Sequence, residues 1–186
     1  MLKKKIKILL YGTVIWSLGE GMFGPIFAVF AKKIGGDILD VAWAWALYLI
    51  VTGALVMIVG KMSDTWRNKE KLMIIGFSIN TILTFGYIFV SSPMHLFAIQ
   101  IGLGVGNALF EPTWDALFDR ADENEKREGF LWGLMLGEKE IILGIAVIIG
   151  GMIVTYFSFN ALFITMGIIQ LIATVYQTRI FKLKKA

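Results

Sequence analysis

The sequence predicts an all-α membrane protein with six transmembrane helices and both ends on the same side of the membrane. Three observations lead to this prediction: an apolar composition, six long apolar segments, and basic residues confined to alternate connections. Of the 186 residues, 57% are hydrophobic and 17% are charged, and the mean hydropathy is +0.73. Soluble domains carry about a quarter charged residues, so most of the surface of this chain must face lipid.

Six segments are long and apolar enough to cross a bilayer, which takes about 20 residues of helix. They cover approximately residues 8–30, 41–60, 72–90, 94–118, 130–154 and 160–178. The connections carry residues typical of loops, such as Gly35-Gly36-Asp37 and Ser91-Ser92-Pro93. Glu20 and Pro25 interrupt the first segment, which therefore does not resemble a cleaved signal peptide. We expect residues 1–186 to form a single six-helix domain.

Lysine and arginine gather in four places that share one side of the membrane when six helices are threaded in order. These are the amino terminus, the 61–71 and 120–127 connections, and the tail from residue 179. The other side carries only Lys32 and Lys33. Short cytoplasmic loops carry the excess of positive charge, so we expect an integral protein of the cytoplasmic (inner) membrane with both termini in the cytoplasm. The net charge of +4 then reflects topology and attraction to the lipid bilayer, and requires no nucleic acid.

The chain also contains two related parts of three segments each. The aligned positions are Gly19–Pro25 with Gly106–Pro112, Gly53 and Gly60 with Gly144 and Gly151, and Gly76 with Gly167. Because each part has an odd number of segments, the second enters the membrane from the opposite side. The sequence therefore predicts an inverted repeat, from about 8–90 and about 94–178, which is a common plan of secondary transporters.

Polar side chains of the fourth segment recur at positions that share one face of a helix. Gln100, Gly104, Asn107, Glu111 and Asp115 are spaced three or four residues apart, which places them on one stripe. Charged side chains within a membrane are costly and normally face a cavity or a partner. We therefore expect this stripe to line a pathway.

The first segment carries the corresponding stripe. Its members are Thr13, Ser17, Glu20 and Gly24. Proline removes a backbone hydrogen bond, so Gly24, Pro25 and Pro112 predict helix breaks beside the two stripes. Two polar stripes next to helix breaks are typical of an aqueous pathway, with Glu20 and Glu111 as candidate proton carriers. The alternative is that the stripes only hold helices together.

Three successive charges, Glu138, Lys139 and Glu140, lie within the fifth segment. Successive residues point in different directions around a helix, so the three do not all face one site. Glu140 falls on a stripe of glycines, which permits close helix contact. We expect Lys139 to pair with Glu20 or Glu111, and we include all three charges in the predicted substrate or proton pathway.

The connection between the second and third segments reads Gly60-Lys61-Met62-Ser63-Asp64-Thr65-Trp66-Arg67-Asn68-Lys69-Glu70-Lys71-Leu72. It resembles the loop signature of the major facilitator superfamily in Gly60, Asp64, Lys69 and Leu72. Arg67 stands where that family usually has glycine. The run from Gln100 to Pro112 resembles the fourth-helix motif of the family, with Gln100 in place of its arginine, and Gly150-Gly151 is similar to the end of its antiporter motif.

Members of this family generally have twelve helices in two six-helix halves, so the resemblance implies one half of a major facilitator fold. It also implies that the first and fourth segments line the central cavity, that the second and fifth form the seam between halves, and that the third and sixth face lipid. The loop with Gly60, Asp64, Arg67 and Lys69 would then act as a gate.

We therefore expect a secondary active transporter that works as a parallel homodimer by alternating access, coupled to protons. Its acidic cavity and aromatic neighbours predict a cationic or amphipathic small-molecule substrate. One alternative is a half that pairs with a different half or belongs to a longer chain. Another is a membrane interaction subunit that transports nothing.

The sequence gives no sign of an enzyme. No HExxH, GxSxG or Walker motif and no cysteine occurs, and the single histidine, His95, lies in a turn. We expect neither a cofactor nor a metal site.

Overall fold

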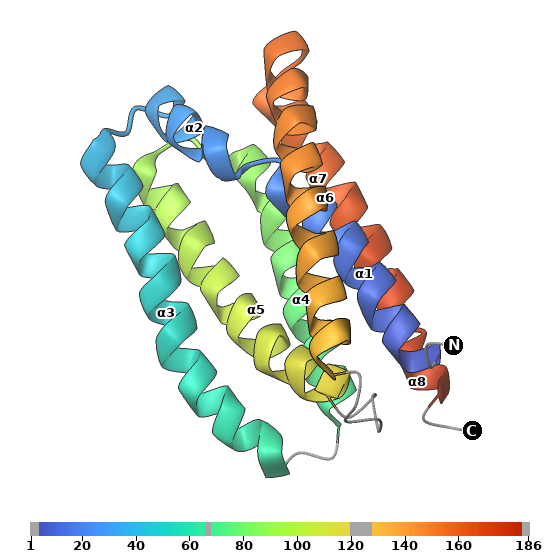
Figure 1. The fold of residues 1–186 in the computed structure, drawn as a ribbon. Helices are drawn as coiled ribbons and strands as arrows, with labels where there is room; N and C mark the ends of the chain where they lie inside the picture. The colour runs from blue at the N-terminus through green and yellow to red at the C-terminus, as the bar shows by residue number, and fades with distance from the viewer. Residues whose placement is uncertain (1–3, 66–67, 120–127, 184–186) are drawn as a thin grey trace.

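The computed structural model describes residues 4–65, 68–119 and 128–183, and within these ranges all regular structure is helical. Six helical spans are long and apolar enough to cross a membrane, which confirms the predicted fold class. The helices are α1 (Lys4–Gly21), η1 (Gly24–Ile26), α2 (Phe27–Lys33), α3 (Ile38–Thr65), α4 (Lys69–Gly86), η2 (Tyr87–Phe89), α5 (Pro93–Asp119), α6 (Glu128–Tyr156), α7 (Phe159–Gln177) and α8 (Ile180–Leu183). Both chain ends lie at one end of the bundle, here named the terminal end (Figure 1).

The first span is interrupted where the sequence places glycine and proline. The α-helix α1 ends at Gly21, the short 3-10 helix η1 holds Gly24 and Pro25, and α2 continues to Lys33. Helix α1 ends one residue after Glu20, so this carboxylate lies beside the break in the span. A methyl group added at Gly150 of α6 would collide with the carbonyl oxygen of Met22, so α6 packs directly on the backbone of the interrupted segment.

The fourth span differs from the prediction at its proline. Helix α5 runs without interruption through Pro112, so the helix break expected there is corrected to a continuous helix that lacks one N–H donor. The hydroxyl of Thr113 donates to the carbonyl oxygens of Leu109 at 2.7 Å and Phe110 at 2.9 Å. The carbonyl group that loses its helical N–H donor at Pro112 is that of Ala108, four residues earlier, and the Thr113 hydroxyl bonds the two carbonyl groups that follow it.

The turn before α3 is closed by two aspartates. The carboxylate Oδ1 of Asp37 accepts hydrogen bonds from the backbone N–H of Leu39 at 2.8 Å and Asp40 at 2.9 Å. The side chain of Asp40 accepts in turn from the N–H of Asp37 at 2.9 Å. Gly35 supplies the left-handed backbone of the turn, with φ of 87°. This reciprocal cap satisfies N–H groups at the start of α3.

The helices pack in two groups that meet along α4 and α7. Helix α1 packs on α6 and α7, α5 packs on α3 and α4, and α4 also packs on α7. Helices α4 and α5 approach so closely that a methyl group at Gly76 would lie 2.6 Å from the carbonyl oxygen of Gly106. Lipid supplies no hydrophobic force between helices, so small residues that allow such contact are a main source of packing energy.

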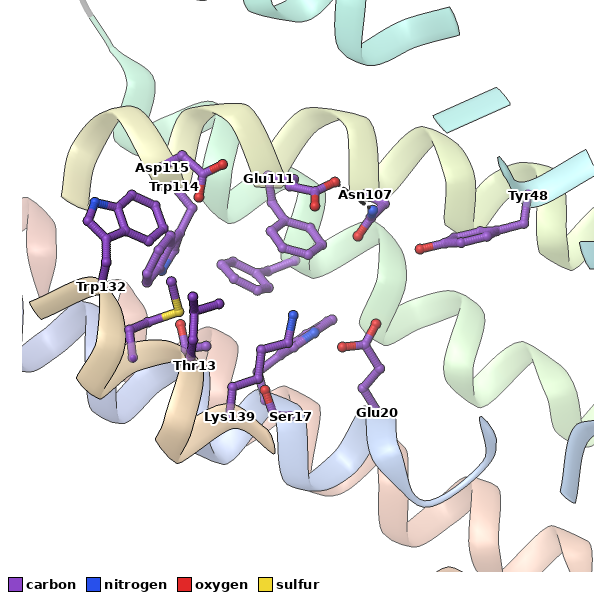
Figure 2. Close-up of a pocket in the computed structure, with 15 residues that line it drawn as sticks. Thr13, Ser17, Glu20, Tyr48, Asn107, Glu111, Trp114, Asp115, Trp132 and Lys139 are labelled. Carbon is purple, nitrogen blue, oxygen red and sulfur yellow. Dashed lines mark hydrogen bonds between the residues drawn. The ribbon is translucent and has the colours of Figure 1, made fainter. Parts of the chain in front are cut away.

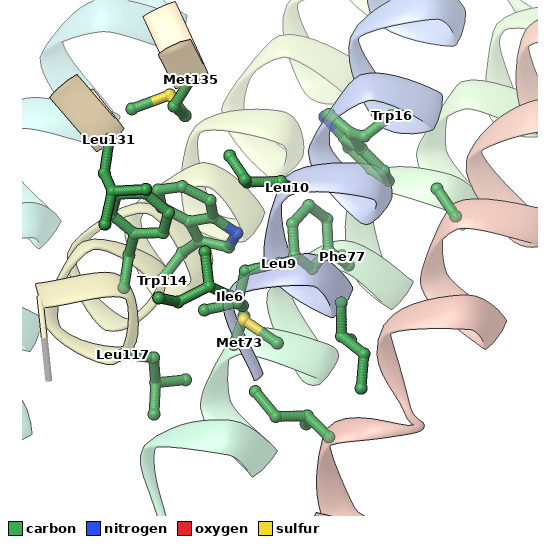
Figure 3. Packing of buried hydrophobic residues seen from close by; sticks show 14 residues of the cluster. Ile6, Leu9, Leu10, Trp16, Met73, Phe77, Trp114, Leu117, Leu131 and Met135 are labelled. Carbon is green, nitrogen blue, oxygen red and sulfur yellow. The ribbon is translucent and has the colours of Figure 1, made fainter. Parts of the chain in front are cut away.

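Two aromatic and aliphatic clusters fill the bundle, one toward each end. At the terminal end, Trp16 of α1 meets Phe77 of α4 edge-on with ring centroids 4.6 Å apart (Figure 3). Phe77 also stacks on Phe110 of α5, with ring centroids 4.4 Å apart. At the other end, Phe23 contacts Tyr87 and Phe163. These contacts fix α1 against α4, α5 and α7, and so set the positions of the polar stripes.

Helices α3 and α6 are the least covered spans. Only 6% of the apolar window of α3 and 11% of that of α6 is buried, against 33–50% for the other four. Within the described chain, nothing lies within 4 Å of a methyl group added at Gly53 of α3 or at Gly133, Gly137, Gly144 or Gly151 of α6. These five glycines therefore pack on nothing within the described part of the bundle.

Candidate functional site

A cavity of about 300 Å³ lies between α1, α5 and α6. Its walls carry the polar stripes that the sequence predicts on the first and fourth spans. The lining side chains are Thr13, Trp16, Ser17 and Glu20 of α1, Tyr48 of α3, Phe77 of α4, Asn107, Phe110, Glu111, Trp114 and Asp115 of α5, and Trp132, Met135, Leu136 and Lys139 of α6. We name this space the carboxylate cavity.

One wall of the carboxylate cavity is the polar face of α5. Asn107, Glu111 and Asp115 follow one another at intervals of four residues and point into the space (Figure 2). The side-chain amide of Asn107 donates a hydrogen bond of 3.0 Å to Oε2 of Glu111. This bond holds one oxygen of Glu111 in place and leaves the other free to meet a ligand or a proton.

The opposite wall carries Glu20 from α1 and Lys139 from α6, which reach toward α5 (Figure 2). Among the described residues, no carboxylate oxygen lies within the 4.0 Å limit of a direct ion pair with Lys139. Lys139 lines the same cavity as Glu20 and Asp115. The cavity thus holds three carboxylates and one ammonium group, with room between them.

A second cavity of about 160 Å³ adjoins the first. It shares three lining residues with the carboxylate cavity, namely Trp16, Glu20 and Tyr48. Its other walls come from the interrupted part of the first span and from α3, α4, α5 and α7. Glu20 therefore lies where the two spaces meet.

The structure brings together most of the residues that the sequence singles out. Glu20, Asn107, Glu111, Asp115 and Lys139 line the carboxylate cavity. Gln100 and Gly24 line the second cavity.

Glu138 and Glu140 line neither of these two spaces, and their assignment to the pathway stays a prediction. Each is offset by one position from Lys139 along α6, which turns it away from the wall that Lys139 lines.

Part of the predicted gating loop can be located. Gly60 lies in α3, and Lys69 begins α4 with only 4% of its surface exposed. The side chain of Asp64 and the whole of Arg67 lie outside the described residues. The gate therefore stays a prediction.

Sequence reasoning missed several polar residues of the second cavity. Asn80 and Thr84 of α4 and Gln170 of α7 line it, on spans that carry no charge in their interiors. They are neutral, so a search for charges passes over them. Asn80 and Gln170 could have been found in the sequence as side-chain amides that stand within otherwise apolar runs.

Among the residues that the structure describes, no three His, Cys, Asp or Glu side chains gather closely enough to hold one ion.

Comparison with known proteins places the chain in a family. Residues 9–185 match the Major Facilitator Superfamily. An uncharacterized MFS-type transporter of Methanocaldococcus jannaschii is 22% identical over 174 residues, which cover 94% of this chain and 45% of that protein. Multidrug resistance protein MdtG of Enterobacter lignolyticus is 22% identical over 177 residues, covering 93% of this chain and 42% of the relative. The same protein of Salmonella typhimurium is 24% identical over 109 residues, or 56% of this chain and 27% of the relative.

The chain spans a little under half the length of the first two relatives. Its six spans, its uncovered α3 and α6, and its polar stripes on the first and fourth spans agree with one six-helix half of such a protein. The match extends over nearly the whole chain, and the chain therefore belongs to the major facilitator superfamily.

Proposed function

We propose that this chain forms one half of a secondary active transporter that moves a cationic or amphipathic small molecule by alternating access. The observation that carries the proposal is the carboxylate cavity, in which Glu111 and Asp115 on one wall face Glu20 and Lys139 on the other across an open space. Groups of this kind inside a membrane mark a route for a substrate or an ion. Printed names of relatives, among them a multidrug resistance protein, support transport of small molecules.

The partner that completes the transporter is, in this proposal, a second copy of the chain. Glu20 and Glu111 are exposed on the isolated bundle, and lipid would cover them at a cost of several kcal/mol each. A parallel two-fold dimer would place the two cavities face to face and cover the glycine faces of α3 and α6. A different half, or a longer chain with both halves, would serve the same purpose and is an outcome of the test below.

The arrangement of contacts supports an inverted repeat. In an inverted repeat, α1 corresponds to α5, α3 to α6 and α4 to α7. Helix α1 packs on α6 and α7, and its counterpart α5 packs on α3 and α4, which are the counterparts of α6 and α7. The contact between α4 and α7 maps onto itself. We propose that the two three-helix units pivot about this contact. The lysines at the terminal end support a cytoplasmic location for both chain ends.

Substrate choice follows from the charge of the cavity. Three carboxylates stand against one ammonium group, so the space favours a positively charged ligand. Trp16, Trp114 and Trp132 add aromatic faces to which a cation or a flat apolar group binds well. Protonation of Glu20 and Glu111 would remove their negative charges and weaken the binding of a cation, and deprotonation would restore it. This alternation would couple transport to a proton gradient.

A flux measurement tests the function. Purified chain in proteoliposomes should accumulate ethidium, an aromatic cation, when a pH gradient is applied. Glu20→Gln and Glu111→Gln should each reduce the rate at least tenfold. Asp37→Asn is the matched control and should keep wild-type rates, because it removes a negative charge outside both cavities and outside the glycine faces while asparagine keeps an accepting oxygen in the turn before α3. Flux that is absent in wild type, or equal in all four proteins, would favour an interaction subunit that transports nothing.

Cross-linking tests the second copy. The chain has no cysteine, so a Gly53→Cys, Gly144→Cys double variant reports only on its own two positions. A homodimer should cross-link between copies in lipid, while Ile82→Cys with Val175→Cys, on exposed positions of α4 and α7, should not. A chain that stays monomeric in native mass spectrometry from nanodiscs would rule out the homodimer.

A further inference from the structure

Five aromatic rings in unbroken contact line the second cavity. They are Tyr87, Phe23, Phe27, Trp45 and Tyr48, and we name them the aromatic arc. The centroids of successive rings lie 5.0, 5.5, 6.1 and 5.6 Å apart in that order. The rings come from η2, from the interrupted part of the first span and from α3, so the arc exists only in the folded bundle.

Side-chain amides line the same cavity, but two of their oxygen atoms are closed off from it. Oδ1 of Asn80 is buried and lies against Gly106, between α4 and α5. Oε1 of Gln170 is buried as well, and the side chain of Gln170 packs on Gly19 of α1. These amides belong to the contacts between helices. The aromatic arc is therefore the main feature by which the cavity can recognise a ligand.

One negative charge accompanies the aromatic arc. Glu20 is the one charged residue among the described residues that line the second cavity. It extends from α1 toward the space that Tyr48 enters from α3 (Figure 2). A single carboxylate beside a wall of aromatic rings favours a ligand group with a single positive charge.

The chemical kind of cation follows from the scarcity of hydrogen-bond acceptors. A primary ammonium group has three N–H donors, and each donor that leaves water without finding an acceptor weakens binding. A quaternary ammonium group has no N–H donor and carries its charge on methyl groups, which bind the faces of aromatic rings. The second cavity is therefore suited to a quaternary ammonium group. A primary one is better matched by the carboxylate cavity, where Glu111 and Asp115 add acceptors.

The size of the cavity agrees with such a group. Its volume is about 160 Å³, and a cavity of about 150 Å³ accommodates benzene. A trimethylammonium group has a bulk similar to that of a benzene ring, so one such group fills the space.

We propose that the second cavity binds the quaternary ammonium head of a transported cation, with its methyl groups against the aromatic arc and Glu20 as its counter-charge. The inference rests on the proposed function for the statement that the ligand is transported. All of the lining residues belong to one chain. Binding can therefore be measured without transport.

Three small ligands of related shape test the proposal. Choline carries a trimethylammonium head, 3,3-dimethylbutanol is its uncharged analogue of the same shape, and ethanolamine carries a primary ammonium group instead. Binding of each is measured by isothermal titration calorimetry to the full chain in lipid nanodiscs. Choline should bind about tenfold more tightly than 3,3-dimethylbutanol, because only choline is attracted by aromatic faces and a carboxylate, and also more tightly than ethanolamine. Equal affinities of choline and either other ligand, or no binding of choline at millimolar concentration, would overturn the proposal.

A pair of tryptophan variants assigns the preference to the aromatic arc. Trp45→Leu removes one ring and keeps an apolar side chain, so the affinity for choline should fall about fivefold, the contribution of one cation–π contact. The affinity for 3,3-dimethylbutanol should stay nearly unchanged. Trp43→Leu is the matched control, since Trp43 is 56% exposed and Trp45 50% on the same helix, and Trp43 lines neither cavity. The same choline affinity in both variants would show that the ammonium group binds elsewhere.

The outcomes separate this inference from the proposed function. A choline preference that depends on Trp45, in a chain without any flux, would keep the quaternary ammonium site and remove transport. Flux of ethidium without a choline preference would keep transport and remove this site. Circular dichroism and thermal unfolding of each variant establish that a lost preference does not come from a lost fold.

Discussion

The carbonyl oxygen of Met22 lies against Gly150, so that α6 covers the backbone at the point where the first span changes from α1 to η1. No side chain fits between these two groups. The relationship links Lys139, eleven residues earlier on α6, to Glu20, two residues earlier on the first span. Both charged residues of one cavity wall are therefore positioned by one backbone contact.

Replacing Gly150 by alanine should disturb this contact. The new methyl group would collide with the Met22 carbonyl, and overpacking of this kind costs about 1–3 kcal/mol. We expect a lower midpoint of thermal unfolding in detergent and slower transport. Gly151→Ala is the control for the unfolding measurement in detergent, because nothing in the described chain lies within 4 Å of a methyl group there and alanine favours a helix. Equal stability of the two variants would show that α6 moves away easily.

Asn107 and Glu111 should act as a unit. Their hydrogen bond of 3.0 Å orients the carboxylate, and a hydrogen bond to a charged group contributes about 1.5–3 kcal/mol. Asn107→Leu should therefore slow transport about tenfold or more. In the Glu111→Gln background, the same substitution should have a much smaller effect, because the charge that it served is gone. Initial rates of the four proteins in proteoliposomes measure this coupling, and additive effects would contradict it.

The contact between α4 and α7 includes a buried hydrogen bond between the hydroxyls of Thr81 and Thr174, 3.1 Å apart. Thr81→Val and Thr174→Val should each lower the free energy of unfolding by about 0.5–1.5 kcal/mol, the range of interhelical hydrogen bonds in membranes. The double variant should cost less than the sum. Thr155→Val is the control, since Thr155 is exposed and bonds only within α6, to the carbonyl of Gly151. If Thr155→Val lowers the free energy of unfolding by the same amount, the effect comes from the helix propensity of valine and not from the hydrogen bond between the two helices.

The positions of the six spans were predictable because length and apolar composition alone decide them. The break near Glu20 was predictable too, since Gly24 and Pro25 disfavour a regular helix. The continuity of α5 through Pro112 was not. A proline in a sequence marks a lost N–H donor, but it does not show whether the packing of that helix on its neighbours, here of α5 on α3 and α4, keeps the helix continuous.

The carboxylate cavity was predicted in outline from the sequence, and the second cavity was not. Spacing along one helix places Asn107, Glu111 and Asp115 together, because i, i+4 neighbours share a face. Asn80 and Gln170 meet Gln100 only through the packing of three different helices. That packing depends on close approaches such as Gly76 to Gly106, which no periodicity within one segment describes.

Lys139 is expected to set the pH range in which the transporter works. It lies in the same cavity as Glu20, Glu111 and Asp115, and its positive charge opposes the arrival of a proton there. Lys139→Met removes this charge and nearly preserves the shape of the side chain. Proton uptake then becomes easier, so the pH profile of transport should move to higher pH. Initial rates at several pH values, with equal pH differences across the membrane, measure the shift. Lys182→Met, in the short helix α8 outside both cavities, is the control and should keep the wild-type profile. A profile that is the same in wild type and both variants would mean that Lys139 does not act on the cavity carboxylates, and that its place on the wall is structural.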